Sequence, residues 1–167
     1  MTLLDHFSVP YKGLKSGLHK LTFDIDTAFF QEFDSTIKVE NRFNVLLNLD
    51  KRHDIADAVF DIKGDIIVEC DRCLGPLNIE IQSENTIRIK YGDPELNNDE
   101  VIFTDENTSI INFAQIIYEF IILSIPIMKM HENIDDCDPE VIKKLNNQAE
   151  ENESSQSVWK DLKDLKF

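Results

Sequence analysis

The chain has 167 residues, of which 42% are hydrophobic and 29% are charged, and its formal net charge is −15. This length suits one domain with a sizeable core, because a chain of this size buries about two-thirds of its unfolded surface. The composition argues against a disordered chain, and the lack of any apolar run of about 18 residues argues against a membrane-spanning helix.

The first half of the chain has the alternation of apolar and polar residues that is typical of strands. Residues 19–27 alternate, and residues 37–49 do so over a longer stretch that predicts one long antiparallel strand with a wet face. Residues 55–70 are apolar on both faces and predict one bent strand or two short strands, with the break at Gly64. Residues 77–91 alternate again, so the segment before them is expected to be the tip of a hairpin.

The second half predicts a loop and then a helix. Residues 93–106 are mostly polar and predict a loop around a brief strand. Asn112 and Gln115 fit a capping box, in which each polar side chain satisfies a free backbone N–H at the start of a helix. The apolar spacing from Phe113 to Ile121 then predicts a core helix, which Pro126 ends.

A weaker helix is expected over residues 138–148. With the strands above, these helices predict an α+β fold, in which an antiparallel β-sheet packs against one main helix and shorter helical segments follow towards the C-terminus. The expected organisation is a single α+β domain over residues 1–149, which contains the hairpin. A polar linker and a short amphipathic segment are expected over residues 150–167.

The last segment has three apolar residues spaced like one face of a short amphipathic helix. They are Trp159, Leu162 and Leu165. Such a segment docks either on its own domain or on a partner, and the spacing leaves both alternatives open.

The negative charge is concentrated in the second half of the chain. Residues 1–92 hold 15 acids and 11 bases, a difference of −4, whereas residues 93–167 hold 17 acids and 6 bases, a difference of −11. Nucleic-acid binding depends on cations that replace the counterions of phosphates, so the second half is expected to repel RNA and to suit a basic protein partner. The alternative is that the acids only keep the protein in solution.

Two cysteines at the predicted hairpin tip, Cys70 and Cys73, have the spacing that fills two corners of a tetrahedral zinc site. His131 and Cys137, which follow the predicted core helix, could supply the other two ligands. The spacings leave open the alternative of ordinary thiols. A thiol-redox role is disfavoured, because Gly75, Pro76 and a strand follow the cysteine pair where a redox site would have a helix.

A small basic patch is a candidate for RNA contact. If two of the predicted strands are neighbours in the sheet, four basic side chains on their polar faces could touch phosphates. These residues are Lys38, Arg42, Arg88 and Lys90. Interleaved acids, among them Glu40, Glu80 and Glu84, favour a solvated sheet face over this contact.

Neither an enzyme nor an exported protein is expected from the sequence. No motif of a metalloprotease, a serine hydrolase, a phosphate-binding loop or a dinucleotide site occurs in it. The start of the chain lacks the pattern of a signal peptide, and three cysteines suit a reducing compartment, so a cytoplasmic location is expected.

Three segments together resemble the YceD-like family. The first is Val68-Glu-Cys70-Asp-Arg72-Cys73-Leu74-Gly-Pro76, the second runs from Ile110 to Pro126, and the third is Trp159-Lys-Asp-Leu162-Lys-Asp-Leu165-Lys. His131 and Cys137 match the position where members of the family carry a His or Cys cluster. The motif residues of the resemblance are Cys70, Arg72, Cys73, Leu74 and Pro126.

The resemblance implies a role in large ribosomal subunit biogenesis, through accumulation of the large-subunit ribosomal RNA, and it implies no catalytic residues. The leading hypothesis is a non-enzymatic factor that engages a basic large-subunit ribosomal protein or a pre-ribosomal particle. The alternative is a direct RNA-binding protein with a zinc-stiffened hairpin. A thiol oxidoreductase that uses Cys70 and Cys73 is the third hypothesis.

Overall fold

The structure, a computed structural model, describes residues 3–154 except residues 36, 40, 41, 97, 99, 106 and 107. The described residues form two compact units. Unit 1 comprises the described parts of residues 1–68 and 78–127, and unit 2 those of residues 69–77 and 128–167. Each unit has a buried cluster of its own.

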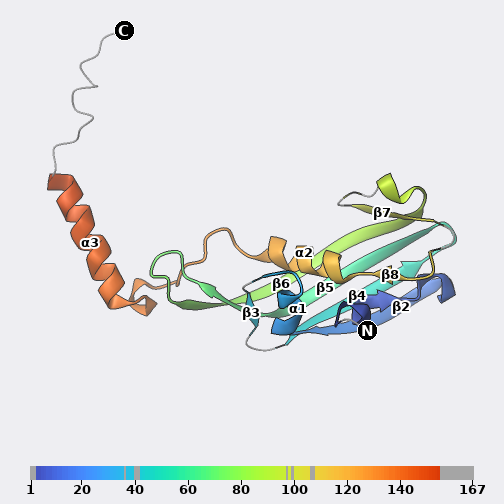
Figure 1. Ribbon diagram of the computed structural model, residues 1–167, viewed down its shortest axis with the longest axis horizontal. Coiled ribbons are helices and arrows are strands. Elements are labelled where there is room, and N and C mark those ends of the chain that lie inside the picture. The colour runs from blue at the N-terminus through green and yellow to red at the C-terminus, as the bar shows by residue number, and fades with distance from the viewer. Residues whose placement is uncertain are drawn as a thin grey trace, which may run out of the picture. The chain divides into compact units, whose positions relative to one another are not determined.

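The main sheet has the strand order β2-β4-β5-β6-β7, and β3 pairs with β5 (Figure 1). The strands are β2 (Gly17–Ile25), β3 (Lys38–Val39), β4 (Phe43–Lys51), β5 (Ile55–Glu69), β6 (Pro76–Tyr91) and β7 (Val101–Thr104). A second sheet consists of β1 (Ser8–Val9) and β8 (Ile111–Asn112), which pair antiparallel. β4 pairs antiparallel with both β2 and β5, whereas β7 runs parallel to β6.

The predicted long strand over residues 37–49 was wrong, because its two parts pair with β5 in different registers. The register of β4, in which Asn44 faces Lys63, would place Val39 opposite Val68 if the strand continued, but Val39 faces Ile66. The apolar alternation itself is confirmed in β4, where Phe43, Val45, Leu47 and Leu49 are all buried. Alternation therefore identified the buried face but not the shift of two residues in pairing.

Gly64 does not break β5, which runs without interruption from Ile55 to Glu69. The ring of Phe43 lies over Gly64, and a Cβ added at Gly64 would lie 2.5 Å from Cγ of that ring. The glycine is therefore needed for a close approach between neighbouring strands, and not for a bend.

The predicted α+β fold, an antiparallel sheet packed against one main helix with shorter C-terminal helical segments, was wrong. The protein is mostly β, the sheet includes a parallel pair, and no single helix covers the sheet. The helices are α1 (Thr27–Gln31), α2 (Ala114–Ser124) and α3 (Pro139–Ser154), with 3-10 turns η1 (Leu3–Phe7), η2 (Tyr11–Gly13), η3 (Pro94–Leu96) and η4 (Ile134–Asp136). None of the helices within the described residues is long and apolar enough to cross a membrane.

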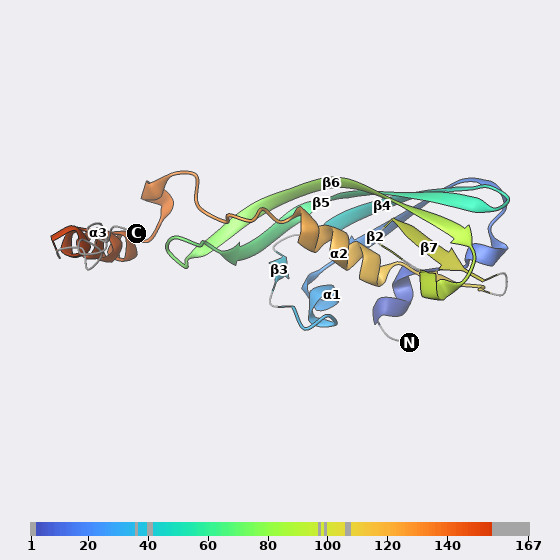
Figure 2. The ribbon, with the colours of Figure 1, turned by 90° about the horizontal axis from the view of Figure 1, so that it is seen from above.

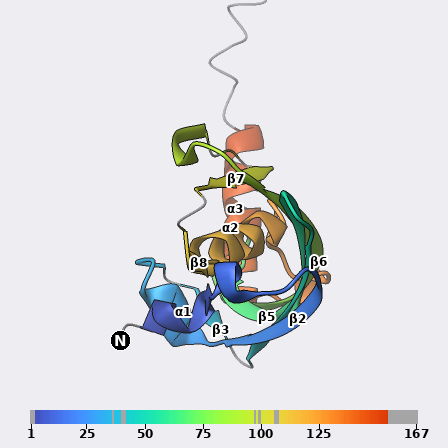
Figure 3. The same cartoon turned by 90° about the vertical axis from the view of Figure 1, so that its right-hand side faces the viewer.

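Several short elements together cover the concave face of the sheet in unit 1. Figures 2 and 3 show α1 and α2 on the same side of the curled sheet. Phe7 of η1 packs on Phe29 of α1 with ring centroids 4.8 Å apart, and Phe60 of β5 packs on Phe113, just before α2, at 5.6 Å. Each fully buried ring of this kind contributes about 1.5–3 kcal/mol to the free energy of unfolding, so these contacts between elements define the core.

The start of α2 differs from the predicted capping box, although its end at Ser124, before Pro126, is as predicted. Oδ1 of Asn112 accepts a hydrogen bond from the N–H of Ala114 at 2.8 Å, but Asn112 itself belongs to β8. Gln115 donates to the carboxylate of Glu119 at 2.7 Å. The helix start is therefore held by β8, which a local capping pattern does not reveal.

α3 is longer than the predicted helix over residues 138–148, since it extends to Ser154. The predicted docking residues Trp159, Leu162 and Leu165 lie outside the described residues. The division between a domain of residues 1–149 and a tail of residues 150–167 therefore stays a prediction.

Candidate metal centre

The tip of the β5–β6 hairpin is a tight turn that carries two cysteines. The N–H of Cys70 donates to the carbonyl of Gly75, and the N–H of Leu74 donates to the carbonyl of Cys70, both at 2.8 Å. Leu74 has a φ of 59°, a left-handed conformation that costs a leucine about 1–2 kcal/mol. The turn is thus closed by its own backbone, with the thiols of Cys70 and Cys73 both buried.

The segment after Ile127 is attached to this turn through Asp71 and Lys129. The N–H of Asp71 donates to the carbonyl of Lys129 at 2.6 Å, and the N–H of Lys129 donates to the Asp71 carboxylate at 2.7 Å. An ion pair at 3.5 Å joins the two side chains. The backbone hydrogen bond from Lys129 is the largest reason that the pKa of Asp71 lies below its usual value. These contacts bring His131 next to the cysteines.

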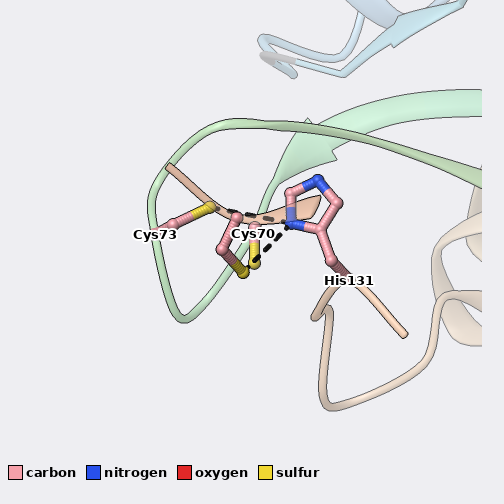
Figure 4. A group of neighbouring side chains, drawn as sticks. Cys70, Cys73 and His131 are labelled. Carbon is pink, nitrogen blue, oxygen red and sulfur yellow. Dashed lines mark hydrogen bonds between the residues drawn. The ribbon is translucent and has the colours of Figure 1, made fainter. Parts of the chain in front are cut away.

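Four side chains of unit 2 converge. The ligand atoms of Cys70, Cys73, His131 and Cys137 all lie within 4.8 Å of one another. Nδ1 of His131 is 3.6 Å from Sγ of Cys73 and 3.5 Å from Sγ of Cys137. Figure 4 shows the imidazole of His131 directed towards the sulfurs. The predicted convergence of these four residues is confirmed.

The spacing of these atoms fits a tetrahedral metal ion. With Zn–S bonds of about 2.3 Å and a Zn–N bond of about 2.0 Å, a sulfur and a nitrogen ligand lie about 3.5 Å apart. The two distances from Nδ1 of His131, 3.6 and 3.5 Å, match that separation. Three thiols and one imidazole also form a donor set that suits zinc. The cluster can therefore hold a metal ion between its four side chains.

The orientation of the His131 ring is fixed from its other side. Nε2 of His131 lies 3.2 Å from the carbonyl oxygen of Pro76, to which it can donate only when it carries the proton. Nδ1 then has its lone pair free on the side of the Cys73 and Cys137 sulfurs. A second partner of this kind is usual for a histidine that binds a metal ion.

The surroundings of Cys70 and Cys137 shift the pKa values of these two thiols in opposite directions. Burial raises the pKa of Cys70, but backbone N–H groups of Cys73, Arg72 and His131 donate to its sulfur and bring the pKa down from 9.0 to about 6. Burial raises the pKa of Cys137, and the adjacent Cys73 adds to this rise, whereas the guanidinium of Arg72 opposes it. A cation among the sulfurs would favour the thiolate form of all three.

The cysteines also form the buried part of the cluster that the described residues of unit 2 contain. Cys70, Cys73 and Cys137 are free thiols with exposed fractions of at most 4%. Among the described residues, the partly buried apolar side chains that pack against them are Leu77, Val141 and Ile142. A metal ion bound by these four ligands would add a cross-link to this cluster. Four protein ligands around one buried point also leave no open position, which is typical of a structural metal site.

Arg72 contacts this centre in a way that the sequence did not reveal. Its Nη1 donates to Sγ of Cys137 at 3.7 Å and its Nη2 to Sδ of Met130 at 3.8 Å. From the sequence, Arg72 was only a motif residue between two cysteines. The roles of Asp71, Lys129 and the Pro76 carbonyl were also missed, since no local pattern links residues 58 or 55 positions apart.

The candidate RNA-contact residues do not form one patch. Lys38 faces Ile67 of β5, whereas the Nε of Arg88 donates to Asp57 of the same strand at 2.8 Å. Ten residues of strand separate these points, which is about 33 Å. Arg42 lies directly before β4, and Lys90 is half-buried in β6. These four side chains therefore lie too far apart to contact one phosphate together.

The remaining motif residues lie at exposed positions. Leu74, at the hairpin tip, is 71% exposed, and Pro126 is exposed after the end of α2.

Comparison with known proteins identifies the family. Residues 58–166 match the family described as Large ribosomal RNA subunit accumulation protein YceD. No curated protein and no solved structure matches the chain significantly. The matched region includes the cysteine hairpin, α2 and both later ligands of the candidate metal centre. The expected resemblance is confirmed: the chain belongs to the YceD family of large ribosomal RNA subunit accumulation proteins.

Proposed function

We propose that the protein is a non-enzymatic factor that promotes accumulation of the large-subunit ribosomal RNA by binding a basic ribosomal protein or a pre-ribosomal particle. The family match over residues 58–166 supports the first part of this proposal. The distribution of charge supports the second part. The proposal includes a cytoplasmic location.

The exposed acids of unit 2 favour a basic partner over bare RNA. Residues 93–167 carry −11 of the net charge of −15. Five acids close to the metal centre are exposed: Glu132, Asp135, Asp136, Asp138 and Glu140. Their field attracts a lysine- and arginine-rich protein and raises its association rate, whereas it repels phosphates.

The proposal includes a zinc ion in the candidate metal centre. Cys70, Cys73, His131 and Cys137 would hold the ion, which would supply a structural cross-link and no reaction. The hairpin and the segment after Ile127 would then remain attached, so that the acidic residues from Glu132 to Glu140 are presented on a fixed support.

Metal analysis of protein purified without chelator tests the zinc. One zinc per chain is expected for the wild type, and none for the variant His131→Ala. His53→Ala is a matched control, because His53 is an exposed histidine of unit 1. Absence of zinc from the wild type would show that the cluster is not a zinc site, and full occupancy in His131→Ala would show that the imidazole is not a ligand.

The main test of the function has a cellular part and a binding part. In cells that lack the gene, we expect less large-subunit ribosomal RNA and fewer large subunits on a sucrose gradient, with both restored by the wild-type gene. In solution, we expect the purified protein to bind basic large-subunit ribosomal proteins more tightly than the ribosomal RNA. This binding should weaken with added salt, because exposed charges are screened over about 8 Å at physiological ionic strength.

A pair of charge variants makes the binding test specific. The variant Glu132→Gln, Asp135→Asn, Asp136→Asn, Glu140→Gln removes four acids from unit 2. The control Glu32→Gln, Asp54→Asn, Glu80→Gln, Glu84→Gln removes four exposed acids from unit 1. Only the first variant is expected to bind the ribosomal protein more weakly. Tight binding to bare ribosomal RNA, unchanged in the first variant, would instead support direct RNA binding.

A further inference from the structure

Unit 1 contains a groove of about 470 Å³ between α2 and the β6–β7 edge of the sheet. This volume lies within the range of about 300–1,000 Å³ that is usual for ligand sites. Six of the lining residues are apolar: Ile87, Ile102, Ile111, Ile116, Phe120 and Leu123. The remaining ones are polar or acidic, so the groove has an apolar floor with a polar rim.

Part of this apolar surface faces solvent. Leu123, at the end of α2, is 80% exposed. Ile116 and Phe120 remain only partly buried although they pack against the core. A contiguous apolar surface of this kind gains free energy when a partner covers it.

The charge at the groove is negative. Glu119 lines the groove, and exposed Glu100 lies between two lining residues in sequence, Asn98 and Ile102. The nearest bases along β6, Arg88 and Lys90, alternate with Ile87 and Ile89, so their side chains point to the other face of the sheet. Among the described residues that line the groove, none is basic.

We propose that this groove binds a short amphipathic segment of a basic protein. Apolar side chains of that segment enter the groove, and its lysine or arginine side chains pair with Glu119 and Glu100. An uncharged apolar ligand would gain nothing from the acidic rim, and a nucleic acid would be repelled by it. The inference rests on the proposed function and assigns the basic partner to a particular surface of unit 1.

Peptide binding to the full-length protein tests this docking site. The probes are fluorescein-labelled peptides that tile the large-subunit ribosomal proteins, and the measurement is fluorescence anisotropy at two salt concentrations. We expect tight binding only from peptides that combine apolar with lysine or arginine residues. Leu123→Ser and Glu119→Gln should each weaken this binding by about tenfold, since each removes one contact at a buried interface.

Two control variants match the groove variants in chemistry and exposure. Leu18→Ser changes a leucine of β2 that is 61% exposed, and Glu32→Gln changes an exposed acid next to α1. Both should bind the peptides like the wild type, and all four variants should keep the wild-type melting temperature. Equal binding by groove and control variants would overturn the assignment. Preferential binding of a peptide of residues 155–167 would also overturn it, because the occupant would then be the protein's own C-terminus.

The same variants separate this inference from the proposed function. If Leu123→Ser loses peptide binding while cells that lack the gene keep normal ribosomal RNA levels, the groove assignment holds and the proposed function fails. If loss of the gene lowers ribosomal RNA but Leu123→Ser binds peptides like the wild type, the function holds and the groove assignment is wrong.

Discussion

Arg72 is the charged side chain in contact with the cysteine cluster. A zinc ion with three thiolates and one neutral imidazole has a net charge of −1, and the guanidinium that donates to Sγ of Cys137 compensates for it. We expect Arg72→Ala to lose zinc to a chromogenic chelator about tenfold faster, as is usual when an outer partner of a metal ligand is removed. Arg42→Ala, at an exposed position in unit 1, is the control. Equal rates for both variants would exclude this role.

Asp57 is the centre of the main ion-pair group on the sheet. The hydrogen bond from Arg88 holds the pKa of the Asp57 carboxyl below its usual value, against an opposing effect of burial, and Arg52 adds to the lowering. The folded state therefore gains stability above the usual pKa of 3.8, and this gain disappears as the pH falls through the lowered pKa. Asp57→Asn should melt at a lower temperature than the wild type at pH 7 but not at pH 2. A difference that persists at pH 2 would point to lost packing.

At the scale of elements, α2 contributes one face to the core and another to the surface. Ile117 is fully buried, so Ile117→Asp should abolish cooperative folding, because an unpaired buried carboxylate costs several kcal/mol of a total of about 5–15. Leu123→Asp on the same helix should remain folded, because Leu123 is 80% exposed. Circular dichroism during thermal unfolding distinguishes the two. A folded Ile117→Asp with an unchanged melting temperature would show that this face is not core.

The contact between β4 and β5 at Gly64 is equally testable. Gly64→Ala should lower the free energy of unfolding by about 1–3 kcal/mol, because the new Cβ would overlap the buried ring of Phe43. Gly13→Ala is the control, since nothing lies within 4 Å of a Cβ at that position. Urea unfolding followed by far-UV circular dichroism measures the free energy of unfolding of both variants. A neutral effect at Gly64 would mean that the two strands can separate at no cost.

The sequence predicted which faces of the strands are buried, because side-chain alternation depends only on the burial of one face. It failed where the structure depends on partners distant along the chain. The register shift at Val39, the parallel pairing of β7 and the start of α2 at β8 all arise from such partners. The length of α3 was underestimated, because residues 149–154 are mostly polar and apolar spacing does not mark the end of the helix there.

The candidate metal centre was predictable because its ligands belong to rare residue types. Three cysteines and a histidine after a helix stop leave few combinations, and the structure brings those four together. The groove of unit 1 had no such signature, since its lining comes from β6, β7, β8 and α2, in which isoleucine and phenylalanine are ordinary core residues. The basic patch was predicted from residues that the fold keeps apart, because the faces of two strands were compared without knowledge of the register. Its residues were Lys38, Arg42, Arg88 and Lys90.

At the scale of the whole molecule, the two units differ in what stabilises them. Unit 1 has a large core, whereas the cluster of unit 2 consists of three cysteines and a few partly buried side chains. Chelation of zinc should therefore raise hydrogen exchange in residues 69–77 and 128–147 and leave the core strands of unit 1 protected. Mass spectrometry of the exchanged protein, with added zinc as the reversal, measures this. Uniform exchange with and without chelator would show that unit 2 is stable without metal.

The two halves of the metal centre also differ in when they become available. Cys73 and His131 are 58 positions apart in the chain. At a synthesis rate of about 5–20 residues per second, the hairpin thiols wait about 3–12 s before the imidazole follows them out of the ribosome. During that interval the other two ligands of the candidate metal centre, His131 and Cys137, have not yet been synthesised. The metal centre can therefore be completed only late in the synthesis of the protein. An incomplete chain that ends before Cys137 lacks the fourth ligand.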